Sequence, residues 1–132
     1  MLQITHNTTY AVRCLVYLKD RPGKFLPLKQ IAAGTNIPAP FLSKILQSMT
    51  RHGFAKSGRG SGGGFQLALP AEKISMYDIV LAASGGGAAL KVPCVRGEVP
   101  CALHQDCRLR SMWSDLGEII GMHLRSRTLA QL

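Results

Sequence analysis

Residues 40–69, PFLSKILQSMTRHGFAKSGRGSGGGFQLAL, decide the fold. In residues 40–52, apolar side chains recur at spacings of three and four, which predicts an amphipathic helix with one buried face. The buried face is formed by Leu42, Ile45, Leu46 and Met49. Phe41 is expected to pack where this helix begins. Two strands are then predicted at 54–57 and 65–69, joined by a glycine-rich turn.

Two further helices are predicted before this stretch. The nearer one covers residues 28–33, and Gly34 is expected to take the left-handed conformation just past its end. Two helices joined by a short turn of this kind form a helix-turn-helix. An earlier helix is predicted at residues 8–19, with Asn7 or Thr8 as its polar cap. The hairpin that follows the last helix is then the wing of a winged helix-turn-helix.

The outer face of the helix at 40–52 carries no acidic side chain and can donate hydrogen bonds. Such a face can lie in the major groove and read base edges, although an ordinary amphipathic surface helix shows the same pattern. In the wing, residues 54–69, the glycines let the backbone approach phosphates, and Arg59 can enter a minor groove. The candidate DNA-binding residues are Ser43, Lys44, Gln47, Arg51, Arg59 and Ser61.

Positive charge is concentrated in the N-terminal half. The 132 residues include 16 lysines and arginines and 7 acids, a formal net charge of +9. Residues 1–71 hold nine of the basic residues and one acid, Asp20, which gives this half a charge of +8. The asymmetry favours a polyanionic partner, and double-stranded DNA fits the predicted fold.

Other partners and activities are not expected. Gly58, Gly60 and Gly63 match the dinucleotide motif G-x-G-x-x-G, but a strand follows them where that motif requires a helix, so we expect no nucleotide. No arrangement of side chains indicates catalysis, so we expect no enzyme. No apolar run is long enough to cross a bilayer and the start shows no signal peptide, so we expect a cytoplasmic protein without a membrane partner.

The C-terminal part begins with a short helix. Ser75 is predicted to cap it, Ala83 to end it, and Ile79 and Val80 to be buried. Residues 85–108 then contain glycines, prolines and cysteines and predict no regular structure. A segment of this length without secondary structure is usually functional or disordered.

A long helix is predicted at residues 108–125. Its broad apolar stripe extends beyond the core of a small winged helix, which favours dimerisation over packing within one chain. The stripe contains Leu109, Met112, Trp113, Leu116, Ile119, Ile120 and Leu124. Gly117 and Gly121 would allow another helix to approach closely. The predicted organisation is therefore a DNA-binding domain at 1–84, a cysteine-containing segment at 85–108, and a dimerisation helix with tail at 109–132.

Three cysteines fall in the irregular segment, whereas Cys14 is expected to be a buried core residue. Cys94, Cys101 and Cys107 are able to hold an iron–sulfur cluster. With His104 they form a Cys3His set that suits structural zinc. A redox-active thiol pair is a third alternative, and unreactive cysteines a fourth.

The order of these features resembles the IscR/NsrR family of bacterial transcription regulators. The resemblance covers nearly the whole chain and includes Thr9-Tyr10-Ala11-Val12, the wing motif Arg59-Gly60-Ser61-Gly62-Gly63-Gly64-Phe65, the three cysteines and the long helix. Members of the family are typically homodimers that bind near-palindromic operators, for example as repressors. Many carry a [2Fe–2S] or [4Fe–4S] cluster that reports iron–sulfur supply, nitric oxide, oxygen or iron.

The resemblance also implies roles for single residues. By position, the cluster ligands are Cys94, Cys101 and Cys107. By position, the DNA contacts include Ser43, Lys44 and Arg59. The family's fourth ligand has no counterpart, because Arg110 replaces the histidine of IscR-like members and Thr9 replaces the aspartate of NsrR-like members. The alternatives for this ligand are His104, His6, Asn7 and an exogenous group.

The sequence therefore predicts a mostly helical protein with a small β-hairpin, a winged helix-turn-helix followed by a long dimerisation helix. The first functional hypothesis is a homodimeric DNA-binding transcription regulator controlled by an iron–sulfur cluster. The second is a zinc-stabilised or thiol-redox-switched regulator of the same fold. A small iron–sulfur electron carrier is the third, but such a protein needs neither a basic helix nor a wing.

Overall fold

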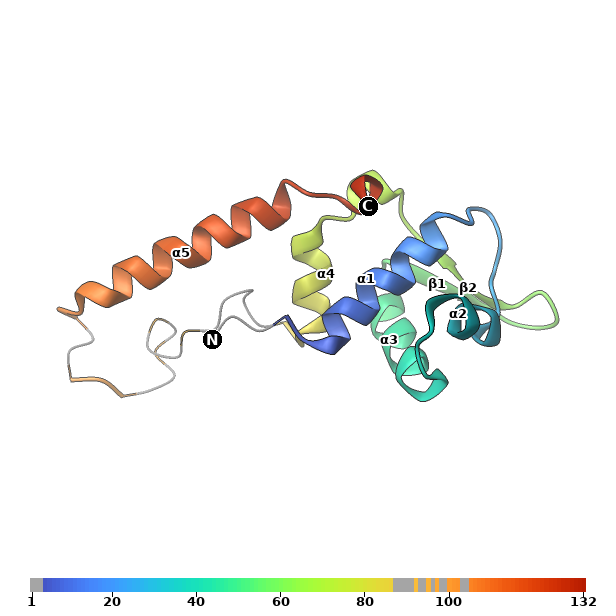
Figure 1. The fold of residues 1–132 in the computed structure, drawn as a ribbon, viewed down its shortest axis with the longest axis horizontal. Helices are drawn as coiled ribbons and strands as arrows, with labels where there is room; N and C mark the ends of the chain where they lie inside the picture. Colours follow the sequence, from blue (N-terminus) through green and yellow to red (C-terminus); the bar gives the residue numbers. More distant parts are fainter. Residues whose placement is uncertain (1–3, 87–91, 93–94, 96, 98–99, 103–104) are drawn as a thin grey trace.

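The computed structural model describes residues 4–86, 92, 95, 97, 100–102 and 105–132. Three helices come first: α1 (His6–Lys19), α2 (Leu28–Thr35) and α3 (Ala39–Arg51). The hairpin strands β1 (Ala55–Gly58) and β2 (Gly64–Leu67) follow. The remaining elements are η1 (Ala71–Lys73), α4 (Met76–Ala83), α5 (Arg108–Arg125) and η2 (Leu129–Gln131). Figure 1 shows α1 to α4 and the hairpin gathered in one body, from which α5 projects as an arm. The predicted fold class is confirmed.

The core lies between α1, α2, α3 and α4. All four apolar residues predicted for the inner face of α3 are buried, as is Cys14 of α1. The largest fully buried side chains are Leu15, Leu18, Ile31, Leu42, Leu46, Met49, Ile74, Ile79 and Leu129. Apolar side chains at helical spacing form one continuous stripe, and packing the helices together removes this stripe from water. The apolar spacing in the sequence therefore determines which helix faces form the core.

The α1 helix begins earlier than the sequence indicated. Its cap is Thr5, whose hydroxyl accepts a hydrogen bond from the backbone N–H of Thr8 at 3.3 Å. Asn7 and Thr8, the expected caps, both lie inside the helix. The prediction was wrong by two residues because threonine occurs at several positions able to cap, and only the backbone path decides between them.

The α2 helix also ends differently. It continues to Thr35, and the left-handed residue past its end is Asn36, with φ of 53°. Gly34 lies within the helix, so its predicted role was wrong. The structure gives another reason for this glycine: a side chain there would collide with the ring of Tyr17 on α1. Gly34 therefore permits the close approach of α1 and α2.

The wing is an antiparallel hairpin attached to the segment before α2. Ala55 pairs with Leu67 at its base, and Gly58 with Gly64 near the turn. Leu26 and Phe65 exchange two backbone hydrogen bonds of 2.8 Å, which add a third short segment beside β2. This pairing holds the base of the wing against the helix-turn-helix.

The second strand of the wing is shifted from the predicted range 65–69. Strand β2 begins at Gly64 and ends at Leu67, and Leu69 beyond it is 39% exposed. Gly64 has φ of 135°, and a side chain there would collide with the backbone carbonyl of Leu26. Glycine is therefore required where β2 meets the Leu26 segment.

The α4 helix agrees with the sequence. Ser75 caps it, and Asp78 completes a capping box by accepting a hydrogen bond from the Ser75 backbone. Ile79 is fully buried, whereas Val80 is only half-buried. The bounds of α5 are those predicted, and its 18 residues give a length of about 27 Å.

After α5 the chain returns to the core. The backbone N–H of Met76 donates to the carbonyl of Arg127 at 2.8 Å, and that of Leu129 donates to the carbonyl of Ile74 at 2.9 Å. The Leu129 side chain is completely buried. Figure 1 shows the end of the chain lying against the body, on the side away from α3. Within the described ranges, no helix is long and apolar enough to cross a membrane.

Candidate nucleic-acid interface

The α3 helix has two faces of opposite character. Opposite its buried face lie the exposed side chains of Lys44, Gln47 and Arg51, with the half-buried Ser43 beside them. Gln47 donates a hydrogen bond to the Ser43 hydroxyl at 3.3 Å, which orients the amide along the helix. The structure thus brings together the four α3 residues that the sequence singled out as candidates for DNA contact.

The wing candidates lie in the turn between β1 and β2. Arg59 and Ser61 are both exposed. Gly63 donates its backbone N–H to the carbonyl of Gly60 at 3.0 Å, which closes the turn. Gly60 has φ of 89°, a conformation that favours glycine. Strand β1 contacts α3, so the wing is anchored to the same helix that carries the other candidates.

The basic side chains of the N-terminal half fall into two groups. Arg13 donates to the Thr35 carbonyl, Arg21 stacks 3.7 Å from the centre of the Tyr17 ring, and Lys19 forms an ion pair with Asp20. These contacts are within the fold. By contrast, Lys44 and Arg59 form no hydrogen bond or ion pair with any residue that the structure describes, and both are exposed. They are available to an anionic partner.

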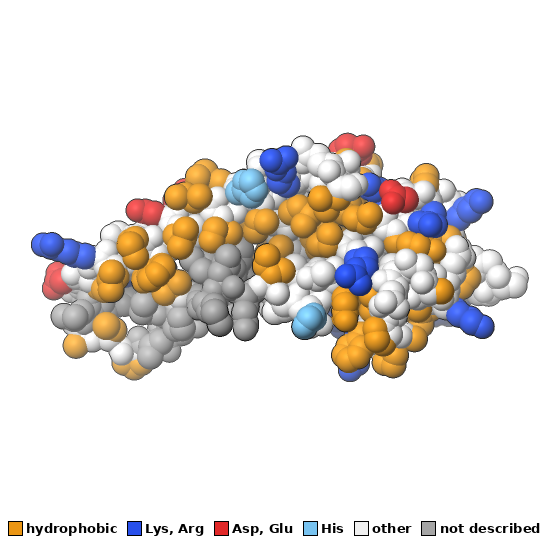
Figure 2. All heavy atoms as spheres, viewed as in Figure 1, with side chains coloured by type: hydrophobic (Ala, Val, Ile, Leu, Met, Phe, Trp, Pro, Cys, Tyr) orange, Lys and Arg blue, Asp and Glu red, His pale blue; other side chains and the backbone are white. Residues whose placement is uncertain are grey.

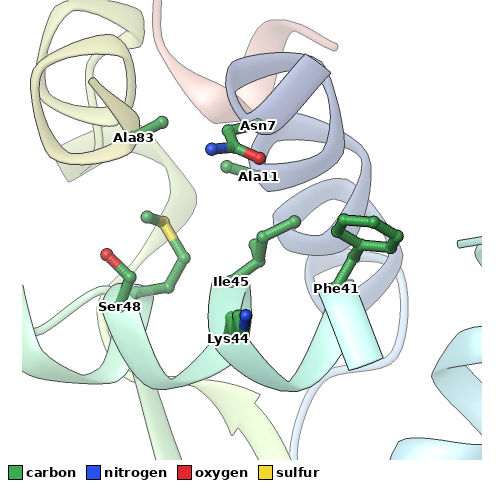
Figure 3. Close-up of a pocket in the computed structure, with 8 residues that line it drawn as sticks. Asn7, Ala11, Phe41, Lys44, Ile45, Ser48 and Ala83 are labelled. Atoms are coloured by element: carbon green, nitrogen blue, oxygen red, sulfur yellow. The ribbon is translucent and has the colours of Figure 1, made fainter. Parts of the chain in front are cut away.

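A groove of about 270 Å³ lies along one flank of α3 (Figure 3). Its wall is formed by Asn7, Ala11, Phe41, Lys44, Ile45, Ser48, Met49 and Ala83. Phe41 was expected to pack at the start of α3, but its side chain is 55% exposed, so that expectation was wrong. The spacing within the helix could have indicated this, because Lys44 and Ser48 lie three and seven residues after Phe41, on the same flank of α3.

The cysteine candidates are only partly described. Cys94 and His104 lie outside the described residues. Cys101 is exposed, and Cys107 is the half-buried N-cap of α5, where its side chain forms no capping hydrogen bond. The described residues contain no group of three metal-ligating side chains.

The two described thiols nevertheless suit a soft metal. Both are free thiols, and thiolate is the donor that iron–sulfur clusters require. Cys14 differs, because burial raises its pKa to about 12 although the nearby Arg13 lowers it. That thiol stays protonated and acts as an apolar core residue, as expected.

The α5 helix divides its apolar residues between two faces. Trp113, Ile120 and Leu124 are half-buried, and Gly121 is buried close to Tyr77 of α4. The other face remains exposed, at 39–59% of each side chain, and consists of Leu109, Met112, Leu116, Ile119 and Met122. Met122 was missed by the sequence, although its spacing of three from Ile119 continues the stripe. Figure 2 shows hydrophobic side chains gathered along the arm.

Comparison with known proteins places this fold. Residues 4–132 match the Rrf2 family, which is described as iron-dependent transcriptional regulators. The chain belongs to the Rrf2 family. It is 30% identical over 132 residues to a putative HTH-type transcriptional regulator of Haemophilus influenzae, covering 99% of this chain and 86% of that one. The IscR regulator of Erwinia tasmaniensis is 29% identical over 133 residues, covering 99% and 78%.

Solved structures of the Rrf2 type agree with the architecture. IscR of T. potens superimposes with a TM-score of 0.76 at 25% identity, covering 98% of this chain and 84% of that chain. CymR of B. subtilis, titled the global cysteine regulator, gives a TM-score of 0.79 at 24% identity and covers 98% and 95%. The resemblance to IscR and NsrR is confirmed. This chain is a helix-turn-helix transcriptional regulator, and its named regulator relatives are not enzymes.

Proposed function

We propose that the protein regulates transcription as a homodimer that inserts α3 into the DNA major groove and places the wing on the neighbouring backbone or minor groove. The observation that carries the proposal is the pair of exposed cations, Lys44 and Arg59, on the two elements that a winged helix applies to DNA. Ser43, Gln47, Arg51 and Ser61 add donors to the same surface. A near-palindromic operator follows from two such surfaces related by two-fold symmetry.

The second copy is proposed to cover the exposed apolar face of α5. Five large apolar side chains on one exposed helix face are unusual for a monomer and typical of a helix that pairs. Pairing through α5 sets the distance between the two α3 helices. Because α5 and α4 pack against each other, the arm and the DNA-binding body then act as one unit.

Control by an iron–sulfur cluster is the third part of the proposal. Cys94, Cys101 and Cys107 would hold the cluster, and the fourth ligand stays open between His104, His6, Asn7 and an exogenous group. When bound, such a cluster supplies a centre that responds to redox state or nitric oxide. The chain's own contribution would be mechanical. In the sequence the three cysteines follow α4 and the last of them caps α5, so ligating all three would tie the body to the arm.

The DNA-binding part is tested with Arg59→Ala. We expect operator affinity to fall by an amount equivalent to about 1–3 kcal/mol, measured by fluorescence anisotropy on duplexes enriched from a random library by the wild-type protein. The matched control is Lys73→Ala, which removes an exposed cation from η1, away from α3. Equal affinity of the Arg59→Ala variant and the wild type contradicts the role of the wing.

The cofactor part is tested by anaerobic purification, followed by a visible spectrum and by iron, sulfide and zinc analysis. We expect a coloured protein with matching iron and sulfide, and loss of the colour in Cys101→Ala but not in Cys14→Ala. A colourless protein with one zinc per chain contradicts cluster control and supports a structural zinc site. A metal-free protein whose DNA affinity changes on oxidation supports a thiol switch.

A thiol-switched regulator is the second candidate, and a specific observation favours it. Cys101 is exposed to solvent and Cys107 is half-buried at the N-cap of α5, and both are free thiols. The structure of CymR from Staphylococcus aureus in an oxidized form also superimposes on this chain, with a TM-score of 0.71 at 25% identity, covering 96% of this chain and 92% of that one. Solvent exposure is one of the properties that make a cysteine susceptible to oxidation.

A further inference from the structure

The first turn of α3 presents only apolar side chains to solvent. Ala39, Pro40 and Phe41 are all exposed, and Phe41 is 55% exposed despite its size. Figure 3 shows Phe41 at the beginning of α3, at the opposite end of the groove from Ala83. The core beneath is already filled, because Ile45 and Met49 are 7% and 1% exposed. Phe41 is therefore not a residue of this chain's own core.

This turn cannot act as a polar contact surface. Its side chains neither donate nor accept hydrogen bonds, and Pro40 has no backbone N–H. The backbone N–H groups of Phe41 and Leu42 both donate to the carbonyl of Pro38, each at 3.0 Å. Side-chain donors to phosphates or to polar base atoms begin only one turn later, at Ser43 and Lys44. The start of α3 is thus suited to an apolar contact.

The position of this turn decides what the contact is. The N-terminal residues of a recognition helix are the ones that reach base edges in the major groove. The base edges exposed there offer one apolar group, the C5-methyl of thymine, and phenylalanine and alanine are among the side chains that pack on it. Hydrogen-bonding readout of guanine or adenine needs Arg, Lys, Asn or Gln instead.

We propose that the first turn of α3 reads thymine, with the Phe41 ring packed against a thymine C5-methyl group in each half-site and Ala39 beside it. This inference rests on the proposed function, because it requires α3 to lie in the major groove. It assigns Phe41 as a specificity-determining residue, whereas Lys44 and Arg51 supply affinity through charge. The operator then contains thymine at the position facing the start of α3.

The test removes the methyl group alone. Duplexes enriched from a random library by the wild-type protein are resynthesised with single thymines replaced by deoxyuridine, which keeps the base pair and lacks only the methyl. We expect one position in each half-site at which the wild type binds the deoxyuridine duplex about fourfold more weakly. Phe41→Ala is expected to bind the two duplexes equally, and Phe41→Leu to retain part of the difference.

The control variant is Leu69→Ala, which shortens an apolar side chain that is 39% exposed but lies outside α3. This variant is expected to show the same difference in affinity between the thymine and deoxyuridine duplexes as the wild type. Circular dichroism melting of each variant checks that the fold is retained.

The outcomes separate this inference from the proposed function. If no duplex is enriched and the wild type does not bind double-stranded DNA, both are wrong. If the wild type binds a defined sequence and no thymine-to-deoxyuridine change matters, the reading of thymine is wrong while the regulator function stands. If a sensitive thymine exists but Phe41→Ala discriminates against deoxyuridine as the wild type does, the assignment of Phe41 is wrong.

Discussion

At the scale of single residues, Gly34 leaves room for the Tyr17 ring, which a side chain at this position would strike. The glycine is inside α2, where its flexibility costs about 1 kcal/mol relative to alanine. The packing of the Tyr17 ring in the space left by the missing side chain offsets this cost. Arg21 stacks on that ring and donates to the Tyr17 carbonyl at 3.2 Å, which fixes the end of α1. One glycine thus sets the spacing of two helices.

We expect Gly34→Ala to lower the free energy of unfolding by about 1–3 kcal/mol, because the added methyl forces the Tyr17 ring to move. Urea denaturation followed by circular dichroism measures this change. Gly62→Ala is the control, since a side chain there meets no atom within 4 Å. Its expected effect is within about 0.5 kcal/mol. Equal losses in the two variants would show that Tyr17 is not the cause.

Cys14 predicts a dependence of stability on pH. Its pKa of about 12 in the fold is above the value of 9.0 of a free thiol, so the unfolded chain loses this proton first. The stabilisation is complete below pH 9 and is lost as pH rises from 9 toward 12, with a slope of at most about 1.4 kcal/mol per pH unit. Urea titrations at pH 8 and pH 10.5 measure it. We expect Cys14→Ala to be less stable than the wild type at both pH values. Its free energy of unfolding should nevertheless fall less between pH 8 and pH 10.5 than that of the wild type.

At the scale of elements, α5 packs one face against α4 and leaves its other face exposed. Gly121 lies against Tyr77 of α4, and the Arg125 guanidinium stacks 3.9 Å from the centre of the Tyr77 ring. These contacts join the C-terminal end of α5 to the body. The other apolar face of α5 stays exposed. The composition of the helix does not show which apolar residues pack on α4 and which stay exposed.

We expect Ile119→Lys to yield a monomer, since a lysine in the centre of the exposed apolar face of α5 leaves a charge buried in the proposed dimer. Sedimentation velocity measures the mass directly. Ser114→Lys adds the same charge to an exposed position on the other side of α5 and should leave the dimer intact. A wild-type monomer at micromolar concentration would falsify pairing through this face.

At the scale of the whole molecule, charge divides the chain into a basic N-terminal half and a nearly neutral C-terminal half. Nearly all of the net charge of +9 belongs to residues 1–71. DNA binding by such a surface releases counterions, so affinity should fall steeply with salt. The C-terminal half, which is close to neutral, lacks this long-range attraction and is suited to pairing with its own copy.

Lys44→Gln is expected to weaken binding to duplexes of any sequence and to reduce the slope of log affinity against log salt by about 1, which corresponds to one lost phosphate contact. Anisotropy titrations between about 50 and 200 mM salt measure the slope. Lys73→Gln, with the same change of charge on η1, should leave the slope unchanged. If both variants change the salt slope equally, the effect comes from the net charge of the protein and not from a phosphate contact of Lys44.

The sequence predicted those features that depend on local spacing. The bounds of α5, the Ser75 cap of α4 and the inner face of α3 follow from periodicity and cap chemistry, and all three were correct. The errors have two sources. Gly34 was misread because the Tyr17 ring that it accommodates belongs to another helix, whereas the α1 cap and the outward side of Phe41 are local features that the spacing was compatible with but did not decide. Four of the DNA-contact candidates share one face of α3 and two lie in the wing turn, whereas Cys94 lies outside the described residues.

The return of the chain after α5 has a mechanical consequence. Because Leu129 is buried in the body and α5 crosses α4 at Gly121, α5 is a lever whose fulcrum lies near its C-terminal end. From Gly121 to Arg108 the helix extends about 20 Å, so a rotation of about 10° at the fulcrum displaces the far end by roughly 3 Å. In the proposed dimer, a displacement of that size at the Arg108 end of each helix would be enough for a chemical change at Cys107 to alter the spacing of the two DNA-binding bodies.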